Sequence, residues 1–189
     1  MGREFELKFA ATPEKLTEIY SQWQEWEEIS METTYFDTPD RRLSAKHCTL
    51  RRRMENGISV CTMKTPTDGF GRGEWDMQAP WNEETAASLF AKAAQEQIPF
   101  SELSAVCGAR FVRNAKTVEL PGCTVEIALD RGVLLGGGKE IPLCEMEVEL
   151  KSGSEKAAVM WAERLASRYD LKAEHLSKFK RAVMLAQEG

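Results

Sequence analysis

The sequence has 189 residues, which is enough for one domain with its own hydrophobic core. Its 25 Lys and Arg residues against 30 Asp and Glu residues give a formal charge of -5, which argues against a nucleic-acid binder that relies on net positive charge. Five cysteines without a Cys-x-x-Cys pair indicate neither a disulfide framework nor a thiolate zinc site, and they favour a reducing cytoplasm.

The first strand is expected from Arg3 to Phe9, where the charged residues Glu4, Glu6 and Lys8 alternate with apolar residues. Successive strand side chains point to opposite faces, so one face is ionic and the other apolar. On an open sheet the ionic face would simply be solvated. The pattern recurs in later strands, which favours a closed sheet that gathers acids and cations in a water-filled interior. No apolar signal region precedes this strand, and no run approaches the roughly 20 apolar residues of a membrane span.

A helix and a strand are expected next. Thr12-Pro13-Glu14 supplies an N-cap hydroxyl, a first-turn proline and an acid near the positive end of the helix dipole. Apolar residues at helical spacing extend this helix to about Glu28. A strand is expected from Met31 to Phe36, and the turn residues Asp37-Thr38-Pro39-Asp40 stop it.

A basic hairpin follows. In the strand from His47 to Met54, Arg51 and Arg53 share one face, and such clustered arginines need an anion. Glu55-Asn56-Gly57 is typical of a type I′ turn, and it leads to a strand from Ile58 to Lys64.

The middle of the chain is expected to add a strand, a helix and two further strands. The strand Arg72 to Met77 carries Arg72, Glu74 and Asp76 on one side, and an alanine-rich helix follows from Glu83 to Gln97. The next two strands run from Ala109 to Thr117, with Arg113, and from Cys123 to Asp130, with Glu126 on the face of Asp130.

Gly132 and the run Gly136-Gly137-Gly138 are expected in a loop. The run resembles a phosphate-binding loop, but no Lys-Ser/Thr follows it, so a hairpin turn is the preferred interpretation.

The last long strand, Leu143 to Lys151, returns to the opening pattern. Glu145, Glu147 and Glu149 lie on one side, where three like charges destabilise a sheet unless a bound cation offsets them. Helices are expected after Ser154 and after Ser177.

About eight strands and four helices, joined by hairpins or by outer helices, predict an α+β fold: an eight-stranded antiparallel β-barrel, or tunnel, with flanking helices. We expect a single domain over residues 1–189.

The charged residues of the expected inner face form an acidic and a basic group of similar size. They are Glu4, Glu6, Lys8, Arg51, Arg53, Lys64, Arg72, Glu74, Arg113, Glu126, Asp130, Glu145, Glu147 and Glu149. Carboxylates without imidazole or thiolate suit a hard divalent cation such as magnesium, manganese or calcium. Arginines suit phosphoryl oxygens, because the planar guanidinium binds two at once. The pattern therefore predicts a site for a metal and a polyphosphate.

Several segments resemble, in order, the motifs of the CYTH domain, the triphosphate tunnel metalloenzyme superfamily. These segments are Glu4-Phe5-Glu6-Leu7-Lys8 (ExExK), Tyr35-Phe36-Asp37-Thr38, Leu50-Arg51-Arg52-Arg53 (LRxR), Met63-Lys64, Arg72-Gly73-Glu74, Glu126-Ile127-Ala128-Leu129-Asp130, Glu145-Met146-Glu147-Val148-Glu149-Leu150 and Ser177-Lys178. Within the family, the chain is most similar to bacterial inorganic triphosphatases. The resemblance implies an enzyme that hydrolyses inorganic tripolyphosphate, or another triphosphate, with Mg²⁺ or Mn²⁺ inside an eight-stranded tunnel. From the cysteines, the net charge and the lack of long apolar runs, we expect a cytoplasmic protein with no nucleic-acid or membrane partner.

The resemblance also implies roles for individual residues. Glu4 and Glu6 hold the first metal with one of Glu145, Glu147 and Glu149, of which Glu149 is favoured, while Asp130 and Glu147 serve a second ion or its water. The residues expected to hold phosphates or to lie among them are Lys8, Arg51, Arg53, Lys64, Arg72, Glu74, Arg113, Lys178 and Arg181. Attack by a metal-bound water on a terminal phosphoryl group is the implied reaction, with Glu4, Glu6, Lys8, Asp130, Glu147 and Glu149 as the catalytic set.

Other functions stay open at this point. The same family includes adenylate cyclases and thiamine or nucleoside triphosphatases, and a polyphosphate-binding module without turnover is the non-enzymatic alternative. Trp75, the aromatic residue that could receive an organic group, is expected to point outward, and Tyr35 and Asp37 are expected to fix a turn.

Overall fold

The structure is a computed structural model that describes residues 2–66 and 72–187; the side chains of residues 2–4 and 72 lie outside what it describes. Its helices are α1 (Pro13–Tyr20), α2 (Arg42–Ala45), α3 (Glu83–Lys92), α4 (Glu155–Arg168) and α5 (Lys178–Gln187), with a 3-10 turn at Phe100–Glu102. Its strands are β1 (Gly2–Glu4), β2 (Glu6–Ala10), β3 (Glu27–Asp37), β4 (Thr49–Glu55), β5 (Ile58–Pro66), β6 (Arg72–Gln78), β7 (Ser104–Leu120), β8 (Cys123–Gly136), β9 (Lys139–Gly153) and β10 (Lys172–Ala173).

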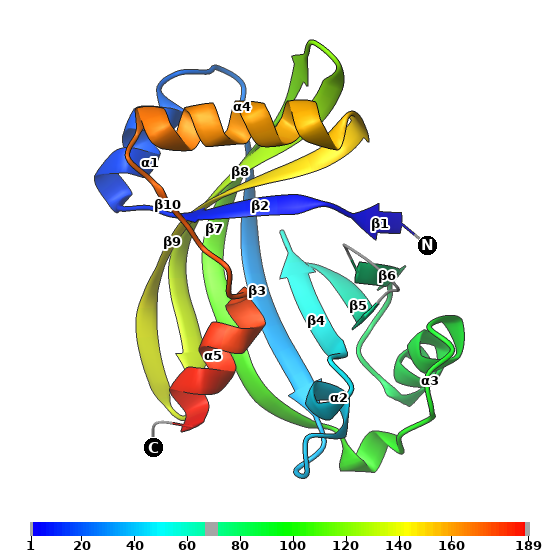
Figure 1. The fold of residues 1–189 in the computed structure, drawn as a ribbon. Coiled ribbons are helices and arrows are strands. Elements are labelled where there is room, and N and C mark those ends of the chain that lie inside the picture. The colour runs from blue at the N-terminus through cyan, green and yellow to red at the C-terminus, as the bar shows by residue number, and fades with distance from the viewer. Residues whose placement is uncertain (1, 67–71, 188–189) are drawn as a thin grey trace.

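All these strands belong to one antiparallel sheet in the order β1-β6-β5-β4-β3-β7-β8-β9-β2-β10 (Figure 1). The first segment of the chain pairs near both ends of that order, because β1 pairs with β6 and β2 pairs with β9. Only Phe5 separates β1 from β2, and its carbonyl accepts a hydrogen bond from the amide of Leu150 at 2.9 Å. Residues 2–10 thus join the two ends of the sheet into a tunnel. Counted as one strand, they give eight long strands in the described chain, which confirms the predicted α+β fold.

Two expected turns are confirmed by their backbone angles. Asn56 and Gly57 join β4 to β5 with φ values of 48° and 84°, and Gly137 and Gly138 join β8 to β9 with φ values of 58° and 75°. The glycine run is therefore a hairpin turn. Gly132, expected in a loop, lies inside β8 instead, where a Cβ would come within 2.1 Å of the Arg110 carbonyl on β7. A glycine is needed at this position because the two backbones approach too closely for any side chain.

Several expected boundaries are wrong. Helix α1 ends at Tyr20 rather than near Glu28, because Glu27 already pairs with Ala115 of β7 and Trp26 closes the intervening turn by donating its indole N–H to the Tyr20 carbonyl at 2.9 Å. Helix α3 ends at Lys92, followed by a left-handed residue at position 94, and the strands β3, β7, β8 and β9 are longer than expected. Each strand continues beyond its alternating segment because its neighbour offers backbone partners there.

The hydrophobic core lies outside the tunnel. Helices α1 and α4 cover the outer faces of β8 and β9, where Ile19, Ile127 and Met146 are fully buried. On another side, Leu89 and Phe90 of α3 pack against β5 and β6 (Figure 1). Each such side chain stabilises the fold by about 1.5–3 kcal/mol. Because the apolar side chains of the strands pack against the outer helices, the charged side chains on the opposite face line the tunnel.

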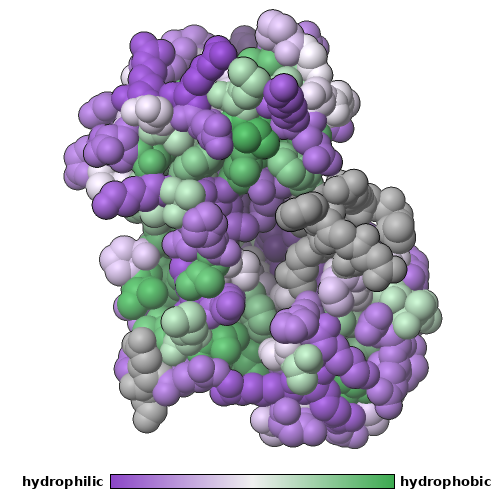
Figure 2. Space-filling view, in the orientation of Figure 1, coloured by the Kyte–Doolittle hydropathy of each residue, from purple (hydrophilic) through white to green (hydrophobic). Residues whose placement is uncertain are grey.

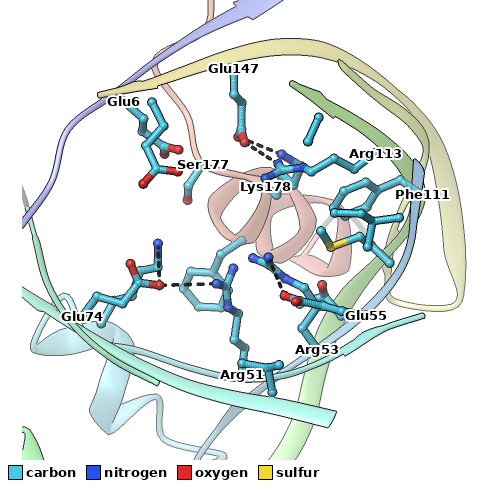
Figure 3. Close-up of a pocket in the computed structure, with 18 of the residues that line it drawn as sticks. Glu6, Arg51, Arg53, Glu55, Glu74, Phe111, Arg113, Glu147, Ser177 and Lys178 are labelled. Atoms are coloured by element: carbon cyan, nitrogen blue, oxygen red, sulfur yellow. Dashed lines mark hydrogen bonds and ion pairs between the residues drawn. The ribbon is translucent and has the colours of Figure 1, made fainter. Parts of the chain in front are cut away.

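Helix α5 closes one end of the tunnel. Ala182 is fully buried beside Leu134 and Leu143, and a Cβ on Gly136 would lie 2.3 Å from the Ala182 carbonyl. The first residues of α5 line the tunnel interior, and Figure 3 shows the helix across its far end. In the described residues, no helix is long and apolar enough to span a membrane.

Candidate functional site

The tunnel interior is a cavity of about 540 Å³. Figure 2 shows a hollow with hydrophilic side chains on this face of the molecule, and Figure 3 shows charged side chains converging on the cavity from its wall. The predicted site residues that line it are Glu6, Lys8, Arg51, Arg53, Lys64, Glu74, Arg113, Glu126, Glu147, Glu149 and Lys178.

A row of three carboxylates crosses one wall of the cavity. Glu149 of β9 lies directly opposite Glu6 of β2 on one side and Glu126 of β8 on the other. Two lysines reach this row: the Lys8 ammonium lies 2.7 Å from Glu6, and the Lys151 ammonium lies 2.8 Å from Glu149 and 3.4 Å from Glu126. Neighbouring like charges destabilise a sheet, so the row favours an added cation.

The pKa of Lys8 reflects the carboxylates that surround its ammonium group. Burial lowers the pKa of Lys8, but the carboxylates of Glu6 and Glu147 outweigh burial and leave the pKa above its usual value. The ammonium is therefore held charged inside the cavity.

A second acidic group lies deeper, next to α5. Carboxylate oxygens of Asp130, Glu145 and Glu147 come within 4.8 Å of one another. The ammonium of Lys178 contacts all three, at 2.7 Å from Asp130, 2.8 Å from Glu147 and closer still to Glu145. Arg113 binds Asp130 through two hydrogen bonds of 2.8 and 2.7 Å. This group is therefore already compensated by cations of the protein.

The pKa shifts follow from these contacts. Burial lowers the pKa of Lys178, but the three carboxylates outweigh it and hold the pKa well above its usual value. Burial raises the pKa of Glu147, but Lys178 and Arg113 outweigh it and hold the pKa well below its usual value. For Glu145 burial dominates and the pKa is raised, although Lys178 and Arg181 both bind it.

The opposite wall is basic. Glu74 lies between Arg51 and Lys64, 3.5 Å from the guanidinium and 3.4 Å from the ammonium. The guanidinium of Arg53 lies 3.2 Å from Glu55. The Nε atoms of Arg51 and Arg53 are buried and find no hydrogen-bond acceptor among the described residues. Buried donors without an acceptor are costly, and an anion in the cavity would supply one.

Three predicted residues with described side chains do not line the cavity. Asp130 and Glu145 are fully buried behind its surface, and Arg181 binds Glu145 from α5. Glu4 and Arg72 pair through their backbones, but their side chains lie outside the described part of the structure.

Sequence reasoning missed some residues that do line the cavity. Glu55 and Lys151 each follow a predicted inward residue by two positions, so strand alternation could have identified both. Tyr35, expected to fix a turn, instead lines the cavity and packs its ring 5.0 Å from that of Phe179. Asp37 does fix the turn, since its carboxylate accepts hydrogen bonds from the amides of Thr38, Leu43 and Ser44. Trp75 packs in the outer core beside α3, as expected.

The two walls differ in what they can bind. Hard divalent cations prefer carboxylate oxygens, and the row of Glu6, Glu149 and Glu126 offers three along the cavity wall, although among the described residues it is Asp130, Glu145 and Glu147 whose oxygens all lie within 4.8 Å of one another. The deeper group holds an ammonium at its centre, so a metal there would have to displace Lys178. The residues present thus fit a divalent cation in the outer row and phosphate groups on the arginine wall.

Known proteins resemble this chain over its full length. The CYTH domain family model matches residues 2–183. The inorganic triphosphatase of Haemophilus influenzae is 30% identical over 198 residues, an alignment that covers all of this chain and 56% of that protein. The chain therefore spans about half the length of this curated relative.

Two solved structures share the fold. One is a protein from Hippeastrum, studied as an adenylyl cyclase and described as having a dominant triphosphatase activity, with a TM-score of 0.67, 17% identity and coverage of 98% of this chain and 96% of that one. The other is a protein from Pyrococcus horikoshii, with a TM-score of 0.63, 21% identity and coverage of 98% and 99%. The family match spans nearly the whole chain and includes every strand of the tunnel, and the chain therefore belongs to the CYTH domain family.

Proposed function

We propose that this chain hydrolyses inorganic tripolyphosphate to pyrophosphate and phosphate and that it requires Mg²⁺ or Mn²⁺. The observation that carries the proposal is a row of carboxylates facing arginines across one cavity of about 540 Å³. A tripolyphosphate with a divalent cation has the complementary distribution of charge. Family membership and the 30% identity to an inorganic triphosphatase support the same reaction.

Glu6 and Glu149 are the residues proposed to hold the metal, together with Glu4, whose side chain lies outside the described structure. Glu6 and Glu149 lie directly opposite each other in the β2–β9 pair, and this favours Glu149 over Glu145 and Glu147 as the third ligand of the predicted set. A divalent cation bound there would supply positive charge beside the phosphate oxygens. The second ion implied for Asp130 and Glu147 would have to replace the Lys178 ammonium.

The cationic side chains are proposed to hold and orient the phosphate chain. Arg51 and Arg53 offer buried Nε donors, and Lys64 lies on the same wall. Lys8, Arg113 and Lys178 reach the cavity from the acidic side. A water molecule attacks the terminal phosphorus, the bond from that phosphorus to its bridging oxygen breaks, and pyrophosphate leaves with the electron pair. Positioning and charge stabilisation are the main sources of catalysis in such a transfer.

A triphosphate that carries an organic group is the second candidate substrate. Ile29, Met31 and Val60 line the same cavity with apolar side chains, which inorganic tripolyphosphate does not need. Thiamine triphosphate, or a nucleoside triphosphate hydrolysed or cyclised, could place its organic part against them.

One assay separates these candidates: phosphate and pyrophosphate release from tripolyphosphate, ATP, thiamine triphosphate and pyrophosphate, with magnesium, manganese or calcium added singly. We expect tripolyphosphate to be hydrolysed fastest with magnesium or manganese, calcium to be inactive or inhibitory, and EDTA to abolish turnover. Faster turnover of an organic triphosphate would favour the second candidate. Tight binding of tripolyphosphate without any turnover would favour a binding module.

A further inference from the structure

The basic wall of the cavity contains its own competing anion. Arg53 and Glu55 lie two residues apart on β4 and both point into the cavity, where the guanidinium lies 3.2 Å from the carboxylate (Figure 3). The same guanidinium keeps a buried Nε that finds no acceptor in the described residues. The guanidinium of Arg53 therefore forms an ion pair through one terminal nitrogen, while its Nε donor has no acceptor among the described residues.

Glu55 compensates Arg53 only weakly. Burial lowers the pKa of Arg53 to about 10, with Arg51 and Arg113 as the next causes, while the contributions of Tyr35 and Glu55 that raise it are smaller. The surroundings of Arg53 are thus still short of negative charge.

Glu55 is also the partner that can move away. Its side chain keeps 34% of its exposure against 15% for Arg53, and it precedes the tight turn at Asn56 and Gly57. Ion pairs with such exposure contribute little, because water solvates the separated charges well. Two other described acids line this wall. Glu74 is held between two cations and is 19% exposed, and Asp76 accepts a hydrogen bond from the Thr62 hydroxyl at 2.6 Å, so Glu55 is the acid that pairs with Arg53 and is easier to displace than Glu74.

We propose that Glu55 is a displaceable counterion of Arg53, a residue that holds the guanidinium when the cavity contains no phosphate and lowers the affinity for every polyphosphate that uses Arg53. This inference rests on the proposed function, because it takes a polyphosphate as the ligand. A phosphate group that reaches Arg53 breaks the ion pair with Glu55 and leaves that carboxylate beside it as a like charge. Both effects reduce binding, and both depend on a phosphate group that is held at Arg53.

The test measures the dissociation constant of imidotriphosphate, a tripolyphosphate analogue with NH in place of the bridging oxygens, by isothermal titration calorimetry with magnesium. Glu55→Gln keeps the side-chain shape and a hydrogen-bond acceptor but removes the charge, and we expect it to bind the analogue about fivefold more tightly. Glu32→Gln is the matched control, because Glu32 is exposed on the neighbouring strand β3 and does not line the cavity. It should leave the dissociation constant unchanged.

A double-mutant cycle separates this role from a structural one. In an Arg53→Met background, which keeps the apolar stem of the side chain, Glu55→Gln should change the affinity by much less than in the wild type. In steady-state assays with tripolyphosphate, KM should fall by a larger factor than kcat changes.

The inference is overturned if Glu55→Gln binds the analogue no more tightly than the wild type, if neither protein binds it, or if the gain persists in the Arg53→Met background. Its failure can be told from failure of the proposed function. Hydrolysis of tripolyphosphate with unchanged affinity in Glu55→Gln contradicts only the inference, whereas tighter binding without hydrolysis contradicts only the function.

Discussion

At the scale of single residues, the carboxylates of the tunnel form two groups, one buried and paired with cationic side chains and one that faces the cavity. Asp130 and Glu145 are fully buried and bound by side chains of α5, whereas Glu6 and Glu149 face the cavity. A buried carboxylate must be paired to stay charged, and a carboxylate beside water can exchange its partner for a metal. We therefore expect substitutions in the two groups to affect stability and activity differently.

Replacing Glu6 by Gln should abolish turnover and leave the fold intact. The change removes a proposed metal ligand but keeps the side-chain volume, and the loss in kcat should be at least about 100-fold, comparable to the loss of another major electrostatic contributor to a transition state. The measurement is phosphate release from tripolyphosphate with magnesium, together with circular dichroism. Glu28→Gln, on the exposed face of β3, is the control and should keep wild-type activity. Full activity in Glu6→Gln would exclude Glu6 as a metal ligand.

Strand alternation predicted which charged residues share the inner face, but not which of them pair. Eleven of the fourteen predicted site and inner-face residues with described side chains line the cavity, but the pairs of Lys178 depend on how deep each carboxylate lies along the tunnel. That depth is set by strand register and by the position of α5, neither of which a two-residue period determines. Tyr35 was misjudged for the same reason, because its contact with Phe179 exists only once α5 has docked.

At the scale of elements, α5 is the part of the fold whose position depends on charge. Lys178 and Arg181 bind buried carboxylates of β8 and β9, while Ala182 supplies an apolar contact. The sequence predicted a helix after Ser177, since a capping hydroxyl precedes it, and Ser177 does accept a hydrogen bond from the amide of Lys180. It did not predict that the helix closes the tunnel.

Replacing Lys178 by Met should lower the free energy of unfolding by about 3 kcal/mol, because it leaves three buried carboxylates with fewer partners. Urea unfolding at pH 7 measures the change. Lys180→Met, two residues along the same helix at an exposed position, should change stability by less than about 0.5 kcal/mol. Equal effects of the two substitutions would contradict the assigned role of Lys178.

The same contacts predict how stability depends on pH. The pKa of Glu147 is held below its usual value of 4.5 by Lys178 and Arg113, so the folded state keeps this carboxylate charged where the unfolded chain would protonate it. This contribution is complete above about pH 4.5 and is lost as pH falls toward the lowered pKa. Unfolding measured from pH 7 down to pH 3 should show falling stability below about pH 4.5. A curve that is flat or rising there would contradict the pairing.

At the scale of the whole molecule, the alternation in the first strand predicted a closed sheet, and residues 2–10 do join its two ends. The formal charge of -5 gave no indication of a basic wall, because the arginines face inward and are balanced only locally. Strand ends were the least predictable feature, since they depend on neighbours far away in the sequence. The outer helices could be placed from their apolar stripes, because each stripe must cover an apolar sheet face.

The central claim is that a divalent cation and a polyphosphate bind together inside this tunnel, with the metal on the outer carboxylate row. The most direct test is a crystal structure with manganese and imidotriphosphate, in which anomalous scattering locates the metal independently of the rest of the density. We predict an anomalous peak between Glu6 and Glu149, with phosphate groups on Arg51 and Arg53. A peak among Asp130, Glu145 and Glu147, or an analogue bound only on the outer surface, would contradict the account.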